Sequence, residues 1–196
     1  MKTDGGEKFE LLGAQDFPDI GVIEESGSSY EENAAIKAAA WADFAGIPAL
    51  ADDSGLEVRA LGWEPGIRSA RASSGSDSDR IQWLLSRMEN HEDRRARFAA
   101  CVVIAFPDNG KTGCGYFSSR GICGGRITRV PRGRCGFGYD PIFVPDGYDA
   151  TFAEMGPAEK SKISHRAIAM RGVAYMMQSV IKYYAVQYSS NGGLII

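Results

Sequence analysis

The sequence feature that most restricts the fold is the segment at residues 97–106, RFAACVVIAF, in which every residue after Arg97 is apolar. The run is rich in valine, isoleucine and phenylalanine, which favour β-strands. Asp108, Asn109 and Gly110 follow it and form a turn signal typical of hairpins. The sequence therefore predicts that residues 112–119 return antiparallel to this strand, with a further strand near residues 122–129.

Helical signals lie on both sides of the predicted hairpin. Residues 30–44 are rich in alanine and follow Ser28 and Ser29, each of which has a glutamate three residues later, as in a capping box. Residues 81–88 carry apolar side chains at helical spacing, and Ser164 has the position of a cap for a last long helix. The remaining predicted strands are residues 8–12, 48–51 and 56–61.

Helices mixed with isolated strands and a hairpin predict an α/β fold with a mixed β-sheet. The chain has 196 residues, enough for one domain with a core of its own. No internal repeat, low-complexity segment or linker divides it, so we expect one domain over residues 1–196. Residues 189–196, SSNGGLII, are expected to form a frayed tail.

The composition argues against several classes of protein. The net charge of −3 argues against nonspecific nucleic-acid binding, and no apolar run approaches the ~20 residues of a membrane span. The first ten residues, MKTDGGEKFE, lack the apolar core of a signal peptide. No two cysteines have CxxC spacing, which argues against zinc and favours reduced thiols in a cytoplasmic protein. The cysteines are Cys101, Cys114, Cys123 and Cys135.

The first segment that can carry chemistry is DDSG at residues 52–55, where a short apolar run is expected to meet a loop. Neighbouring carboxylates alternate in direction on a strand, so one of them can face a site and hold Mg²⁺ with a distant carboxylate. An acidic turn is the structural alternative. On the preceding helix Asn33 and Lys37 share one face, which is also the pattern of a solvated surface.

Two later segments can bind a nucleotide. Residues 133–141, GRCGFGYDP, combine three glycines with Phe137, which can stack on a base, and Asp140, which can read its edge. Lys160 can offset phosphate charge, and His165 and Arg166 can donate hydrogen bonds to a base carbonyl. A plain glycine-rich turn and a structural histidine are the alternatives. The chain has neither a P-loop nor a GxGxxG motif.

Taken together and in this order, these segments resemble the inosine-triphosphate pyrophosphatase family, which removes non-canonical purine nucleoside triphosphates. GFGYDPIF followed by EKSxISHR is the most specific part of the resemblance. The matching stretches are YEENAAIKA (30–38), PALADDSGLEV (48–58), PGIRSAR (65–71), ARF (96–98), GRITRVPRGRCGFGYDPIF (125–143) and EKSKISHR (159–166).

The resemblance implies an elongated mixed β-sheet with two α/β lobes around a nucleotide cleft, and a homodimer. It implies Mg²⁺-dependent hydrolysis of the α–β phosphoanhydride of ITP, dITP or XTP to a monophosphate and pyrophosphate. By the same resemblance Asp53 is the general base and a metal ligand, with Glu24 and Glu32 as the other metal-site acids. The implied substrate-binding residues are Lys37, Ser54 and Lys160 for phosphate, Phe137, Gly138, Tyr139 and Asp140 for the base pocket, and His165 and Arg166 for the 6-keto edge.

Donors at His165 and Arg166 agree with a preference for inosine and xanthine. These bases carry a 6-keto acceptor where adenine carries an amino donor, and a donor facing an amino group leaves both unpaired. Guanine also carries the 6-keto group, so the two donors do not account for its exclusion.

Residues 1–10 have no match to the T/S-x-N-x-x-K loop with which the family grips the triphosphate. Charge-assisted contacts contribute ~1.5–3 kcal/mol each, so the sequence predicts weakened triphosphate binding and an exposed sheet edge. A start of the sequence downstream of that loop explains the difference most simply. The alternatives are a shortened paralogue that binds nucleotide or dimerises with little or no catalysis, and a pyrophosphatase for other modified nucleotides.

Overall fold

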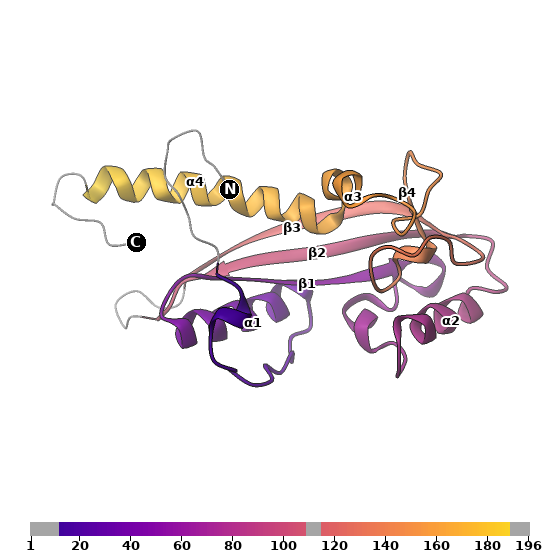
Figure 1. Cartoon of the computed structure of the whole chain (residues 1–196), viewed down its shortest axis with the longest axis horizontal. Helices are drawn as coiled ribbons and strands as arrows, with labels where there is room; N and C mark the ends of the chain where they lie inside the picture. The colour runs from indigo at the N-terminus through magenta and orange to yellow at the C-terminus, as the bar shows by residue number, and fades with distance from the viewer. Residues whose placement is uncertain (1–11, 109–114, 189–196) are drawn as a thin grey trace.

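The computed structural model describes residues 12–108 and 115–188, with side chains placed as far as residue 178. Figure 1 shows an elongated molecule in which long strands run side by side, with α1 and α2 below the sheet and α3 and α4 above it. The elements are α1 (Tyr30–Ala45), β1 (Ala49–Val58), α2 (Asp77–Arg87), β2 (Arg95–Ala105), β3 (Tyr116–Ile127), β4 (Phe143–Pro145), α3 (Pro157–Ile163) and α4 (His165–Tyr188). Short 3₁₀ turns are η1 (Ala14–Asp16), η2 (Arg59–Leu61), η3 (Gly66–Arg71) and η4 (Asp140–Ile142).

The strands of the described sheet lie in the order β1-β2-β3-β4, and each neighbouring pair is antiparallel. The predicted α/β fold with an elongated sheet and the pairing of β2 with β3 are therefore confirmed. The sheet was predicted to be mixed, but within residues 12–108 and 115–188 its pairing is antiparallel throughout. None of the helices in this part of the chain is long and apolar enough to span a membrane.

Three predictions about strand boundaries are wrong. The strand expected at residues 56–61 ends at Val58, and residues 59–61 form η2. Residues 52–55 were expected to form a loop, but they lie inside β1, because β2 continues beside them and pairs with every one of its residues. Residues 112–119 and 122–129 were expected to form separate strands, but β3 is continuous through Gly121. The predicted strand at 8–12, most of the hairpin turn and the tail at 189–196 lie outside the described residues.

Helix α1 begins and ends as its sequence predicts. The backbone N–H of Glu32 donates to the Ser29 hydroxyl at 3.2 Å, and Gly46 ends the helix with a left-handed φ of 69°. Three of its alanines pack on one face of the sheet with no exposed surface, because small side chains let the helix lie close to the strands. This cluster contains Ala34, Ala38 and Ala42 with Cys101, Val103 and Ala105 of β2.

Helix α4 covers the opposite face of the sheet, where a glycine of β3 allows it to come close. Ala169 and Val173 pack on Ala100 and Val102 of β2. A Cβ atom added at Gly121 would overlap the carbonyl oxygen of His165 and would lie 2.6 Å from the backbone nitrogen of Ala169. The absence of a side chain there fixes the first turn of α4 against β3.

A third, larger cluster fills the other end of the molecule. Phe98 of β2 packs edge-on against Phe143 at a centroid distance of 4.7 Å and stacks on Phe152 at 6.0 Å. Leu84 and Met88, at and just beyond the end of α2, complete this core with no exposed surface. The core is thus divided between the two ends of the sheet, and the two-lobe division with a nucleotide cleft stays a prediction.

Gly121→Ala should destabilise the protein by about 1–3 kcal/mol, since the new methyl group must push α4 away from β3. Gly115→Ala is the matched control, because a Cβ atom there meets no atom of the described residues within 4 Å. Urea denaturation measures both variants. Equal stability of the two would show that α4 does not depend on close approach at Gly121.

Candidate active site

Three consecutive residues of β1, Asp52, Asp53 and Ser54, place their polar side chains on alternate faces of the sheet. Asp53 pairs in register with Cys101, whose side chain belongs to the α1 cluster. Asp52 pairs with Val102 and Ser54 with Ala100, both of which face α4. Side chains alternate along a strand, so Asp53 faces α1 while Asp52 and Ser54 face α4. Neighbouring carboxylates were expected to point in opposite directions on a strand, and they do, although residues 52–55 themselves were expected to lie in a loop.

On the α1 face, Asp53 is held by the helix. The Asn33 side-chain amide donates to Asp53 Oδ2 at 3.0 Å, and the Lys37 ammonium lies 3.7 Å from Oδ1. Asn33 is fully buried and also accepts a hydrogen bond from the Gly27 backbone N–H at 2.8 Å, which fixes its orientation. Burial raises the pKa of the Asp53 carboxyl, against the lowering effects of Asn33 and Lys37. Asp53 is therefore an oriented carboxylate of increased basicity.

Sequence reasoning assigned no role to two further residues on this face. The Lys37 ammonium donates to Glu25 at 2.7 Å, and Arg71 of η3 lies 3.6 Å from the other Glu25 oxygen. Neither residue had a distinctive local signal, because Glu25 is one of two adjacent loop acids and Arg71 ends a short polar turn. The motif PGIRSAR, which contains Arg71, was the only available signal.

The predicted metal acids Asp53, Glu24 and Glu32 do not form one cluster. Glu24 is exposed, and the Glu32 carboxylate accepts hydrogen bonds from the Ser28 backbone N–H at 2.6 Å and hydroxyl at 2.8 Å. Near the start of a helix, free amides and the helix dipole favour a carboxylate, so the Glu32 side chain points back toward Ser28, just before the helix. Within the described residues, no three His, Cys, Asp or Glu side chains form a group able to hold a metal.

On the α4 face, two cations flank an exposed aromatic ring. The Phe137 ring is 59% exposed, with the Lys160 ammonium 4.9 Å and the Arg166 guanidinium 5.1 Å from its centroid. Arg166 also donates from Nε to Asp52 Oδ2 at 2.6 Å. Phe137, Lys160 and Arg166, which the sequence placed in one site, thus lie together beside β1.

The loop that carries Phe137 is held from beneath. Asp140 is buried, accepts from the Phe137 backbone N–H at 3.0 Å and forms an ion pair with Lys160. Tyr139 is also buried, and its hydroxyl donates to the Ser69 carbonyl at 3.0 Å. Both side chains therefore position the loop in this structure.

Asp77 at the start of α2 holds the same loop, and sequence reasoning missed it. Its carboxylate accepts from the Gly138 backbone N–H at 2.6 Å and forms an ion pair with Arg80. The Gly138 hydrogen bond is the main cause of the lowered pKa of Asp77, followed by the contact with Arg80. The contact joins residues 61 positions apart, so no local pattern could predict it.

His165 is buried and stacked at the start of α4. Its ring lies 4.6 Å from that of Phe98 and is tilted by 8°, and only 3% of the residue is exposed. Neither ring nitrogen has a hydrogen-bond partner within the described residues. Burial, with smaller contributions from Arg166 and Lys160, lowers the pKa of His165 to about 3. The imidazole is therefore neutral near pH 7, with one N–H donor and one acceptor.

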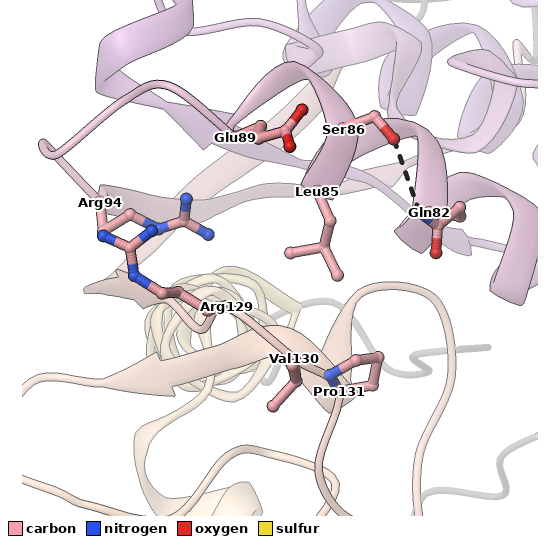
Figure 2. Close-up of a pocket in the computed structure, with 8 residues that line it drawn as sticks. All are labelled: Gln82, Leu85, Ser86, Glu89, Arg94, Arg129, Val130 and Pro131. Carbon is pink, nitrogen blue, oxygen red and sulfur yellow. Dashed lines mark hydrogen bonds between the residues drawn. The ribbon is translucent and has the colours of Figure 1, made fainter.

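A separate pocket of about 350 Å³ lies between α2 and the segment after β3 (Figure 2). It contains none of the predicted site residues. Its guanidinium groups are already engaged, because Arg94 donates to the carbonyls of Met88, Ile127 and Thr128, and Arg129 pairs with Glu92. The lining residues are Gln82, Leu85, Ser86, Glu89, Arg94, Arg129, Val130 and Pro131.

The sequence matches the Ham1 family over residues 2–176. The chain belongs to the Ham1 family. It is 49% identical over 166 residues to a Deinococcus radiodurans protein named dITP/XTP pyrophosphatase, covering 84% of this chain and 78% of that protein. A Thermus thermophilus protein of the same name is 46% identical over 169 residues, with 84% and 78% covered.

Solved Ham1 structures share the fold. A HAM1 protein from Coxiella burnetii superposes with a TM-score of 0.74 at 40% identity, covering 82% of each chain. A Mycobacterium abscessus structure titled nucleoside-triphosphatase / dITP/XTP pyrophosphatase superposes with a TM-score of 0.70 at 38% identity, covering 88% of each chain. The family resemblance predicted from the sequence motifs is confirmed.

The Ham1 chain should lose stability in mild acid through His165. An unfolded histidine binds a proton below pH ~6.5, whereas folded His165 stays neutral until about pH 3. The contribution of neutral His165 to the free energy of unfolding is therefore complete above pH 6.5. It falls by about 2 kcal/mol on going to pH 5. His165→Phe, which keeps an aromatic ring on Phe98, should remove this part of the pH dependence in urea denaturation. The prediction would be contradicted if the free energy of unfolding fell equally in the two proteins between pH 7 and pH 5.

Asp77→Ala should loosen the loop that carries Phe137. Loss of the carboxylate leaves the Gly138 amide without its partner, so its hydrogen exchange should accelerate by about tenfold or more. Ser78→Ala, at the next and exposed position of α2, is the control. Exchange at Gly138 that stays at the rate of the unaltered protein would show that the loop is held by other contacts.

Proposed function

We propose that this protein hydrolyses ITP, dITP and XTP to nucleoside monophosphate and pyrophosphate. One observation carries the proposal: β1 presents a basic, oriented Asp53 beside Lys37 on one face, and on the other its Asp52 holds Arg166, which lies against Phe137. The relatives named dITP/XTP pyrophosphatase support the substrate class.

The base binds on the α4 face of the sheet. Phe137 is exposed and offers a flat surface for stacking. Arg166 supplies N–H donors for the 6-keto oxygen, and the contact with Asp52 holds Arg166 near Phe137. The neutral His165 carries a further N–H, but its ring nitrogens are buried, so it donates to the base only where substrate binding uncovers it. An adenine amino group would leave these donors unpaired, which favours hypoxanthine and xanthine over adenine.

The phosphates extend across β1 toward the α1 face. Among the described strands β1 pairs with β2 alone, so its other edge is where the two faces meet. Ser54 lies on the base side, one residue from Asp53, and its hydroxyl can donate to a phosphate oxygen on the way. Lys37 then offsets the phosphate charge next to Asp53.

Asp53 acts as the general base. It removes a proton from water, whose oxygen attacks the α-phosphorus while the bond to the α–β bridging oxygen breaks and pyrophosphate leaves. The raised pKa makes Asp53 a better base than an exposed aspartate, and Asn33 keeps its carboxylate oriented. Asn33 is thus a positioning residue.

A divalent cation, Mg²⁺ in our proposal, fits the chemistry of the α1 face. Mg²⁺ takes one or two protein carboxylates together with waters and substrate phosphates, so it does not require a third acid. Asp53 and Glu25 supply such a pair around Lys37, and Glu24 and Glu32 stay predictions as further ligands. When bound, the ion would offset phosphate charge and lower the pKa of water.

The family resemblance also supports a homodimer and a single domain over residues 1–196. The small number of cysteines, none at CxxC spacing, supports a cytoplasmic location. The acidic composition supports the absence of a nucleic-acid partner. A paralogue that binds nucleotide or dimerises with little catalysis is the competing function.

Asp53→Asn should lower the rate of ITP hydrolysis by about 100-fold or more, because an amide cannot accept the proton from water. Pyrophosphate release from ITP, XTP, dITP, GTP, ATP and TTP with Mg²⁺ should show activity on the first three and little on ATP and TTP. Asp149→Asn, at an exposed residue outside the site, is the control.

Three outcomes would overturn this account. Surviving activity in Asp53→Asn would mean that another group is the base. Binding of ITP without pyrophosphate release by the unaltered protein would favour the non-catalytic function. Activity confined to pyrimidine nucleotides would contradict the proposed reading of the purine edge.

A further inference from the structure

Glu25 is shared by two cations that come from different elements. Lys37 reaches it from α1 at 2.7 Å, and Arg71 reaches it from the end of η3 at 3.6 Å. The side chains of Glu25 and Lys37 are only 28% and 22% exposed, so their contact is partly shielded from solvent. Asp53 is the next carboxylate along, 3.7 Å from the Lys37 ammonium.

An ammonium and a guanidinium around one carboxylate are also the groups that recognise a phosphate. Both anions present paired oxygens, and an arginine fork donates to either in bidentate form. Lys37 and Arg71 balance Glu25 and Asp53 in formal charge, so the acids hold the cations in place before a polyanion arrives. A phosphate group can compete for both because it offers more oxygens and more negative charge.

Arg71 combines a fixed backbone with a side chain that can move. Two residues earlier, the Ser69 hydroxyl accepts from the Leu56 backbone N–H at 2.8 Å and donates to the Gly66 carbonyl at 2.6 Å. These contacts attach η3 to β1, the strand that carries Asp53. The Arg71 side chain is 56% exposed and its contact with Glu25 is long, so it can turn toward a ligand without disturbing the fold.

We infer that Arg71 is a ligand of the leaving pyrophosphate, acting with Lys37 beyond the α-phosphate. This inference rests on the proposed function and adds a residue to its phosphate side. Negative charge develops on the bridging oxygen as the α–β bond breaks, and a guanidinium held near that group stabilises the transition state. Arg71 therefore assists departure of pyrophosphate and contributes little to binding of the monophosphate.

Isothermal titration of two products separates these roles. Inorganic pyrophosphate and IMP are titrated separately, with Mg²⁺, into the full chain and into Arg71→Ala and Arg71→Lys. Arg71→Ala should weaken pyrophosphate binding about 10- to 100-fold and change IMP binding less than about twofold, with Arg71→Lys between. In steady-state kinetics Arg71→Ala should lower kcat for ITP more than it raises KM.

Arg87→Ala is the matched control, since Arg87 is a similarly exposed arginine paired with Glu64 at 2.8 Å and lies outside the site. Unchanged pyrophosphate binding in Arg71→Ala, with an active unaltered protein, would overturn the inference and leave the proposed function standing. Equal losses for pyrophosphate and IMP would assign Arg71 a structural role instead. An unaltered protein that neither binds pyrophosphate nor hydrolyses ITP would overturn both, and urea midpoints verify that each variant folds.

Discussion

The antiparallel pairing of β1 with β2 is the constraint on which the site depends. Ten consecutive residues of β1 pair with β2, so the strand stays regular through its acidic segment and its side chains alternate strictly. Asp53 then faces α1, while Asp52 and Ser54 face α4. A one-residue change of register would exchange the two faces and bring Asp52, instead of Asp53, to Asn33 and Lys37. The buried clusters on both faces prevent that change.

Polar side chains, two of them buried, orient the groups that face substrate. Asn33 orients Asp53, Asp140 holds the amide of Phe137, and Asp77 holds the next amide along the loop. Satisfied networks of this kind rigidify a site, because each buried group would be costly to leave unpaired. These contacts also explain why neighbouring residues of the GFGYDPIF motif have different roles. Phe137 is exposed for stacking, whereas Tyr139 and Asp140 of the same motif are buried beneath it.

Local signals in the sequence predicted the elements whose stability is local. The cap at Ser29, the glycine after α1 and the apolar run of β2 are each specified by a few adjacent residues. The acidic DDSG segment misled because its strand conformation comes from β2, about 50 residues away. The site followed the same rule. The motif residues Phe137, Lys160 and Arg166 came together as expected, whereas Glu25, Arg71 and Asp77 enter through contacts that no spacing encodes.

Every cation of the site is held by a carboxylate, and the burial of that carboxylate determines what the cation can do. Glu25 and Asp52 are partly exposed, so Lys37 and Arg166 can exchange them for a phosphate or a base without leaving a charge buried. Asp140 is 3% exposed, and separating it from Lys160 would strand a buried carboxylate. Lys160 has three N–H donors, however, and can keep Asp140 while it donates to a phosphate oxygen. When Lys160 contacts a phosphate, it therefore keeps the ion pair with Asp140 that positions the Phe137 loop. Phosphate binding is thereby coupled to the order of the loop that binds the base.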